Sequence, residues 1–190
     1  MTRIHIMGPP GSGKTTLARR LSSHLRVTYY ELDDVAWEET YPGTDRPLDI
    51  RLHDVHRIAS QPDWITEGIF LFWTDELLRT ADYVAWLDMP WYLTIWRTIV
   101  RRLRWDIRGS TTEICPPTSP RKQILFLWSI ILYYLSKSRT DTRAFRNKYL
   151  TVYKDKLTYC RNANDVEAFF MKVLAQEQKE IVTTLEAIRG

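Results

Sequence analysis

Residues 8–15 read Gly-Pro-Pro-Gly-Ser-Gly-Lys-Thr and match the pattern G-x-x-x-x-G-K-[S/T]. Such a loop binds polyphosphate, because its glycines let backbone N–H groups turn toward the phosphates and its lysine adds a positive charge. Here Lys14 would reach the terminal phosphates, and the Thr15 hydroxyl would coordinate Mg²⁺. We therefore expect ATP and Mg²⁺ as cofactors, with the nucleotide bound by Gly8, Pro9, Pro10, Gly11, Ser12, Gly13, Lys14, Thr15 and Thr16.

A loop of this type works between a strand and a helix, and the flanking sequence fits both elements. The run 4–7 (Ile-His-Ile-Met) suits a short, buried parallel strand. After the loop, Leu17, Ala18, Leu21 and Leu25 recur at helical spacing. The positive end of that helix would then point at the bound phosphates.

Further strands and helices alternate along the chain. Turn residues separate apolar runs that read as strands over 27–32, 64–67, 83–87 and 157–160. Helices are expected over 52–59, over 74–79 with Thr74 as cap, after Pro90, over about 121–153, and from a capping box formed by Asn164 and Glu167. This alternation predicts an α/β fold, a parallel sheet with helices on both faces.

Size and composition limit the remaining choices. The 190 residues suit one domain, or one core with an inserted lid, and the net charge of +4 fits an anionic ligand without implying nucleic acid. Cys115 and Cys160 lack metal-ligand spacing, so we expect a reducing, cytoplasmic location with no signal peptide. The longest apolar run, 124–135, is too short to span a bilayer. We expect no membrane partner, although this run could pack against a second copy in a homodimer.

The motifs resemble those of P-loop NTPases of the adenylate-kinase-like class, and within it the small bacterial topology modulation proteins. Beyond the loop, the shared pieces are "LDD" with a following Trp, "WITEG", and "AD" followed by "WLDMP", which occupy 32–37, 64–68 and 81–90. The resemblance covers most of 1–104 and, more weakly, 156–174. It implies a three-layer α/β/α fold whose five-stranded parallel sheet has the order 2-3-1-4-5. It also implies a single domain over 1–190 with a helical lid within 97–150, although 109–150 matches no family pattern.

The resemblance also assigns an acceptor side. Glu67, at the end of the third strand beside the P-loop strand, could hold a Mg²⁺-bound water together with Thr15. Asp33 ends the second strand, where kinases of this class hold the acceptor, and its carboxylate could orient the acceptor hydroxyl and take its proton. Glu31 and Asp33 would share one face of an extended segment. The expected substrate-binding residues are Asp33, Asp34, Trp37, Glu67 and Gly68. Whether Asp33 or Asp34 is the base stays open, and either could instead cap a helix.

Arginines are concentrated at the start of the expected lid. Five lie between 97 and 108, against one acid, Asp106: Arg97, Arg101, Arg102, Arg104 and Arg108. Arg97 and Arg101 share a helix face. Similarity to adenylate kinases implies that Arg97 packs on the adenine and Arg101 clamps the transferring phosphates. Arg139, Arg143 and Arg146 could return from the lid in the same role. A solvated basic face is the alternative.

Two classes of function follow from these residues. The first is an ATP-dependent kinase in which Lys14, Asp33, Arg97 and Arg101 are catalytic. Its acceptor is a small molecule that the sequence does not identify, although eight Trp and ten Tyr residues favour a flat one. The second is an ATP-binding protein that acts on DNA, with basic residues on backbone phosphates. Sparse lysines in the lid and the lack of a DNA-reading module make the second class less favoured.

Overall fold

The computed structural model describes residues 2–38, 44–108 and 150–189, except for the side chains of 101–108 and 180–189. At its centre is a five-stranded, all-parallel sheet with the order β2-β3-β1-β4-β5. The strands are β1 (Arg3–Met7), β2 (Tyr29–Glu31), β3 (Trp64–Gly68), β4 (Tyr83–Leu87) and β5 (Leu157–Cys160). The predicted fold class and strand order are therefore confirmed.

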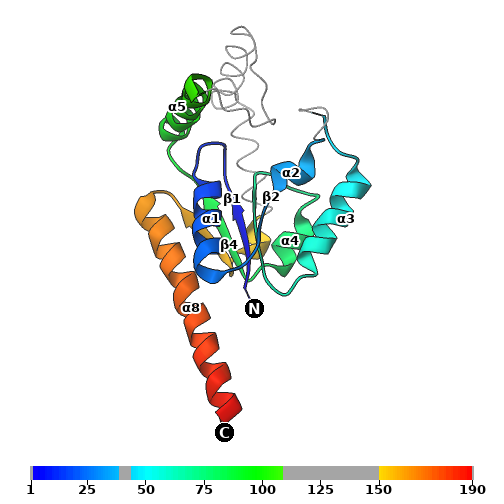
Figure 1. Cartoon of the computed structure of the whole chain (residues 1–190), viewed down its shortest axis with the longest axis vertical. Helices are drawn as coiled ribbons and strands as arrows, with labels where there is room; N and C mark the ends of the chain where they lie inside the picture. The colour runs from blue at the N-terminus through cyan, green and yellow to red at the C-terminus, as the bar shows by residue number, and fades with distance from the viewer. Residues whose placement is uncertain (1, 39–43, 109–149, 190) are drawn as a thin grey trace.

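Helices cover both faces of this sheet (Figure 1). Helices α1 and α8 pack on one face, and α2, α3 and α4 pack on the other. The helices are α1 (Lys14–Leu25), α2 (Leu32–Ala36), α3 (Leu48–Ala59), α4 (Asp75–Thr80), α5 (Trp91–Arg108), the short 3₁₀ turn η1 (Thr151–Tyr153) and α8 (Ala163–Arg189). None of the helices in the described ranges combines the length and the hydropathy needed to cross a bilayer.

Each strand divides its side chains between two cores, because successive residues of a strand point to opposite faces. On β1, Ile4 and Ile6 join the core beneath α1 and α8, whereas Met7 joins the core beneath α3 and α4. On β3, Trp64 joins the α3 and α4 core and Ile65 the other. The near-continuous apolar strands of the sequence are therefore explained by burial on both faces.

The parallel arrangement gathers the chemistry-bearing segments at one edge of the sheet. The carboxyl ends of β1, β2 and β3 meet there, since Met7 is in register with Gly68 and Glu31 with Glu67. The P-loop follows β1, α2 follows β2, and the segment 69–74 follows β3. Open parallel sheets bind ligands at this edge.

The second strand is shorter than predicted. The expected strand 27–32 is reduced to Tyr29–Glu31, and Leu32 begins the short helix α2. Leu32, Val35 and Ala36 have helical spacing and are all buried, so packing of these three residues favours a helix here. The expectation that Glu31 and Asp33 share one face of an extended segment is therefore wrong.

One of two predicted helix caps is confirmed in position and the other is wrong. Thr74 is the N-cap residue of α4, although its hydroxyl donates to the Phe70 carbonyl at 2.9 Å and makes no capping bond. At the start of α8, the side-chain oxygen of Asn162 accepts the Asp165 N–H at 3.0 Å, so the capping residue lies two positions before Asn164. The expected helix over 121–153 and the lid arginines at 139, 143 and 146 lie largely or wholly outside the described residues.

A candidate nucleotide and acceptor site

The P-loop has the backbone conformation that its glycines predict. Gly11 and Gly13 adopt φ values of +76° and +100°, in the left-handed region that side chains disfavour. At Gly11 space is also limiting, because a Cβ atom there would lie 2.3 Å from the Thr94 carbonyl oxygen of α5. The loop therefore depends on glycine both for its turn and for its contact with α5.

Ser12 lies on the inner side of the P-loop. Its side chain is buried, and its N–H donates to the Pro9 carbonyl at 3.2 Å. A Cβ atom at Gly8 would lie 2.9 Å from the Ser12 hydroxyl oxygen, so the missing side chain at position 8 makes room for this hydroxyl. In the described part of the chain that hydroxyl has no hydrogen-bond partner, which is uncommon for a buried polar group. Pro10 and Thr16, also predicted to bind the nucleotide, are exposed.

Lys14 and Thr15 converge on Glu67 at the carboxyl end of β3. The Thr15 hydroxyl donates to Glu67 Oε1 at 2.5 Å, and Lys14 Nζ lies 3.8 Å from Glu67 Oε2. Lys14 Nζ also donates to the Pro9 carbonyl at 3.4 Å. Lys14, which the motif assigns to the phosphates, and Thr15, which it assigns to the metal, therefore both contact Glu67, the acid predicted to help hold the metal.

Burial raises the pKa of the Glu67 carboxyl, which is 4% exposed. The Lys14 charge and the Thr15 hydrogen bond oppose this rise, whereas the charges of Glu31 and Asp33 add to it. Glu31 and Asp33 are therefore close enough to Glu67 to influence it electrostatically. A cation at this point would be favoured, since it would offset three neighbouring negative charges.

The donor atoms at this point suit Mg²⁺. The Thr15 hydroxyl and the Glu67 carboxylate are hard oxygen ligands, and Mg²⁺ in nucleotide sites takes one or two such protein ligands together with phosphate and water. Among the described residues, no three His, Cys, Asp or Glu side chains gather as a metal site. With Thr15 and Glu67 as protein ligands, phosphate and water would supply the remaining ligands of Mg²⁺.

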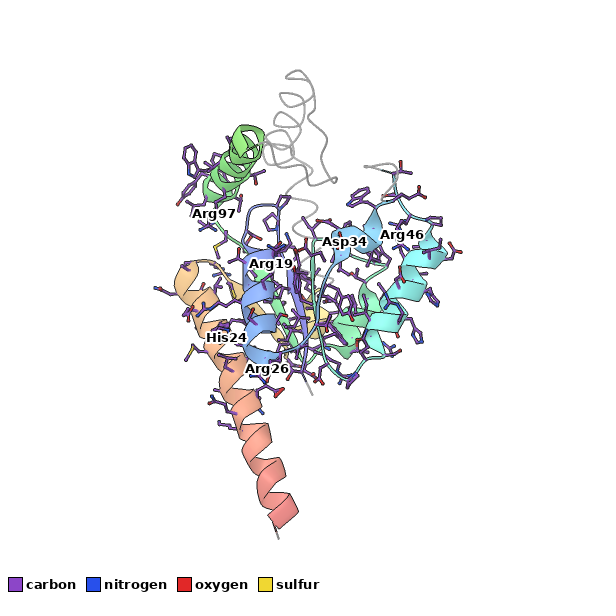
Figure 2. The ribbon with its side chains drawn as sticks, in the orientation of Figure 1. Arg19, His24, Arg26, Asp34, Arg46 and Arg97 are labelled. Atoms are coloured by element: carbon purple, nitrogen blue, oxygen red, sulfur yellow. The ribbon has the colours of Figure 1, made fainter. Side chains whose placement is uncertain are left out.

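Glu31 is held by α1 next to this point. Arg19 Nη2 donates to Glu31 Oε1 at 3.0 Å, and Arg19 Nε donates to the Tyr29 hydroxyl at 2.8 Å (Figure 2). Arg19 and Thr15 are four residues apart on α1, so one helix face contacts both Glu31 and Glu67. The sequence analysis did not identify Arg19.

The two candidate acceptor carboxylates lie on α2. Asp33 and Asp34 occupy its first turn, and both are exposed. Arg46 fixes this helix from the segment before α3, because its Nη1 donates to the Val35 carbonyl at 3.3 Å and pairs with Asp54 Oδ2 at 2.9 Å (Figure 2). These two contacts tie α2 to α3, and an acceptor-orienting carboxylate requires that its helix be held in place.

An aromatic row and an inward-facing arginine lie beside α2. Trp37, predicted as a substrate-binding residue, packs edge to face on Phe70 with centroids 6.3 Å apart, and Phe70 lies 5.0 Å from Trp73. The Arg51 guanidinium is 5.5 Å from the Trp73 ring, and its buried Nε has no hydrogen-bond partner in the described residues. Sequence analysis missed Arg51, although it precedes the buried Val55 and Ile58 by four and seven residues on the inner face of α3.

Gly68 has a structural reason to be glycine. A Cβ atom at this position would lie 2.9 Å from the Leu32 Cβ of α2 and 3.2 Å from the Phe70 ring. The absence of a side chain therefore lets α2 pack against the end of β3. A role for the Gly68 backbone in substrate binding remains a prediction.

Helix α5 brings the predicted lid arginines to the same end of the molecule (Figures 1 and 2). Arg97 is exposed on α5, three residues after Thr94 and directly before Thr98, the two residues that contact Gly11. Arg101 lies one turn farther along the same helix, and its side chain is outside the described part. The adenine and phosphate roles of these arginines stay predictions.

Comparisons with known proteins agree with this site. Residues 4–67, which run from β1 to Glu67, match the AAA domain family. The chain is 31% identical over 105 residues to a cytidylate kinase from Halobacterium salinarum, covering 46% of this chain and 52% of the kinase. It is 28% identical over 90 residues to an adenylate kinase from Xylella fastidiosa, covering 47% and 46%. The chain thus spans about half the length of the curated relatives that it matches.

A solved structure extends the similarity of fold. Shikimate kinase from Acinetobacter baumannii, in complex with shikimate, aligns over 95% of this chain and 94% of its own, with a TM-score of 0.53 and 16% identity. At that identity the likeness concerns the fold alone. The sequence matches therefore show that this chain is similar to P-loop kinases over about half its length, and the structural match shows that the fold is similar over most of it.

Proposed function

We propose that this chain is an ATP-dependent phosphotransferase that moves the γ-phosphoryl group of Mg·ATP to a small acceptor with a hydroxyl group. One observation carries the proposal. Lys14 and Thr15 of the P-loop meet the buried Glu67 carboxylate, 3.8 and 2.5 Å away, at the edge of the sheet where α2 presents Asp33. A phosphate-binding loop and a candidate acceptor base therefore share one edge.

On the nucleotide side, the backbone N–H groups of Gly11, Gly13 and the start of α1 would bind the phosphates. The first turn of α1 contains no acidic residue that would repel them. Lys14 would leave Glu67 and pair with the β- and γ-phosphates, and Thr15 and Glu67 would hold Mg²⁺. Bound Mg²⁺ supplies positive charge against the charge that develops during transfer. Arg97 and Arg101 would complete the phosphate clamp from α5.

On the acceptor side, Asp33 would orient the hydroxyl group and take its proton during transfer. Support comes from its exposure on α2 and from its electrostatic effect on Glu67. Trp37 and Phe70 support an acceptor with a flat ring, and the unpaired buried Nε of Arg51 supports one that carries a negative charge. Asp34 is the alternative base.

The motifs over 32–37, 64–68 and 81–90 support placing the chain with the topology modulation proteins, as a kinase-like member. The lysines are sparse in the lid segment of the sequence, which disfavours action on DNA instead. We infer that the chain works on a small molecule.

The test is a screen of nucleosides, nucleotides and small hydroxy acids for acceptor-dependent release of ADP. With an acceptor in hand, Asp33→Asn should lower kcat by about 100-fold or more while the Kd for ATP stays nearly unchanged. Lys14→Ala should abolish turnover with a thermal melting curve like that of the parent chain.

Asp155→Asn is the matched control, because Asp155 is exposed and precedes β5 at the opposite edge of the sheet. It should leave kcat unchanged. Turnover that survives in Lys14→Ala would contradict the assignment of the P-loop. An equal loss of kcat and ATP affinity in Asp33→Asn would remove Asp33 from its proposed role.

A further inference from the structure

Two acidic side chains lie next to each other at the carboxyl end of the sheet, beneath α1. Glu31 of β2 is in register with Glu67 of β3, and residues in register on neighbouring parallel strands point to the same face from backbones about 5 Å apart. Tyr29, two residues before Glu31, packs against the core beneath α1, so both carboxylates belong to this face. Neighbouring carboxylates disfavour each other's charged form, and each is stabilised by a positive charge.

Helix α1 supplies a separate cation to each of the two carboxylates. Lys14 Nζ lies 3.8 Å from Glu67 Oε2. Arg19 Nη2 donates to Glu31 Oε1 at 3.0 Å (Figure 2). In the proposed function these two cations behave differently. Lys14 would leave for the phosphates and Mg²⁺ would take its place beside Glu67, whereas Arg19, more than one turn farther along α1, would stay with Glu31.

Arg19 is fixed on Glu31 by a closed set of hydrogen bonds. Its Nε donates to the Tyr29 hydroxyl at 2.8 Å, and that hydroxyl donates to Glu31 Oε1, the oxygen that Arg19 also contacts, at 3.1 Å. The pair also differs from an ordinary surface ion pair, because the Glu31 side chain is only 30% exposed. A carboxylate that faces the protein in this way interacts more strongly with a neighbouring charge than a solvated carboxylate does.

Loss of the Arg19 charge would change the chemistry of the site. The carboxylates of Glu31 and Glu67 and the Thr15 hydroxyl would then offer hard oxygen ligands with an additional unneutralised negative charge, a combination that binds divalent cations. The same negative charge would hold Lys14 away from the phosphates and would repel them. Both effects favour a metal that binds without the nucleotide over a metal that enters with it.

We propose that Arg19 is a positioning residue of this site, which holds and neutralises Glu31 so that the site binds a divalent cation only together with the nucleotide. The inference rests on the proposed function, which assigns Mg²⁺ to Thr15 and Glu67. It adds to that function the reason why a second carboxylate beside the metal does not capture a cation in the resting chain.

The experiment is a titration of the nucleotide-free full chain with Mn²⁺, in which electron paramagnetic resonance measures the unbound ion. Mn²⁺ is used because it shares the preference of Mg²⁺ for oxygen ligands. The parent chain should bind Mn²⁺ weakly, whereas Arg19→Gln should bind it about tenfold or more tightly, because an unneutralised charge then lies close to a divalent ion. Arg19→Lys keeps the charge and should bind Mn²⁺ like the parent. The double variant Arg19→Gln, Glu31→Gln should return to weak binding, because Arg19 acts through Glu31.

Arg20→Gln is the matched control. Arg20 follows Arg19 on α1 and also pairs with a glutamate, since its Nη2 donates to Glu167 Oε1 at 2.8 Å, but this partner belongs to α8. Arg20→Gln should therefore bind Mn²⁺ like the parent. A merely structural role of Arg19 predicts a lower melting temperature for Arg19→Gln with no gain in Mn²⁺ affinity.

Thermal melting checks that each variant folds, and Arg19→Met replaces Arg19→Gln if that variant does not fold. Unchanged Mn²⁺ affinity in Arg19→Gln would overturn the proposal, as would tight binding by the parent chain or a gain in affinity that persists in the double variant. The titration contains neither nucleotide nor acceptor, so it is independent of turnover. If the expected Mn²⁺ affinities are found but no acceptor releases ADP, the role of Arg19 stands and the phosphotransferase assignment fails.

Discussion

At the scale of single residues, the P-loop strand contains a buried histidine that the proposed chemistry does not use. His5 lies in the middle of β1, and its Nδ1 is 2.8 Å from the Thr66 hydroxyl of β3. Burial lowers the pKa of His5 from 6.5 to about 3, so the ring is neutral at ordinary pH. Its position between two strands fits a structural role.

This neutral histidine predicts a pH dependence of stability. Between pH 6.5 and about 3, the unfolded chain binds a proton at His5 that the folded chain does not bind. The free energy of unfolding should therefore fall as pH falls through this window, with His5 contributing about 1.4 kcal/mol per pH unit. Urea unfolding at several pH values measures the free energy of unfolding as a function of pH. In His5→Asn, the slope of this free energy against pH should be smaller by the amount that one bound proton contributes.

His53→Asn, at an exposed position of α3, should keep the slope of the parent chain. If His5→Asn and His53→Asn give the same slope, the buried ring does not stay neutral.

At the scale of elements, the P-loop and α5 are coupled by one close contact. Gly11 and Gly13 both have positive φ, but only Gly11 also lies against another element, since nothing lies within 4 Å of a Cβ atom built at Gly13. The contact with the Thr94 carbonyl links the loop that would bind phosphate to the helix that carries Arg97. A displacement of α5 would therefore displace the P-loop and change its affinity for the nucleotide.

The two glycines form a matched pair for a test of this coupling. Gly13→Ala adds only backbone strain and should lower the free energy of unfolding by about 1–2 kcal/mol. Gly11→Ala adds the same strain and a clash 2.3 Å from the Thr94 oxygen, so it should cost more stability and more ATP affinity. Urea unfolding and calorimetric titration with Mg·ATP measure both effects. Equal losses of stability and of ATP affinity in the two variants would show that α5 moves aside without cost.

At the scale of the whole molecule, two apolar cores share a single sheet. Ile58 of α3 and Phe169 of α8 are fully buried on opposite faces, and both cores include residues of β1 and β4. Helix α8 continues past the sheet toward its C-terminal end (Figure 1). Because neither core can lose its packing without exposing the shared strands, we expect the described parts to unfold as one unit.

Truncation of either core tests this expectation and the prediction of a single domain over 1–190. Ile58→Ala should lower the free energy of unfolding by about 2–5 kcal/mol and Phe169→Ala by about 3–5 kcal/mol. In each variant, unfolding followed by tryptophan fluorescence and by far-UV circular dichroism should coincide. Met171→Ala, at an exposed position of α8, should change stability by less than about 0.5 kcal/mol. Two separate transitions would reject the single unit.

Local sequence was sufficient for most elements and for the nucleotide half of the site. The strands Tyr83–Leu87 and Leu157–Cys160 were predicted with their exact bounds, because compact apolar runs flanked by turn residues leave few alternatives. The P-loop motif likewise set the left-handed glycines and the helix that follows them. An error of detail arose at the start of α8, where two asparagines lie close together and Asn162 rather than Asn164 accepts the capping hydrogen bond.

What the sequence determined by itself is therefore a phosphate-binding loop in an α/β chain, since that chemistry lies within eight consecutive residues. Only the tertiary structure decided which distant groups face the loop. The register of β2 and β3 places Glu31 beside Glu67. Burial of Leu32 places Asp33 in the helix α2 rather than in a strand, and the inner face of α3 places Arg51 next to Trp73. These contacts join segments far apart in the chain, and no local pattern encodes such a meeting.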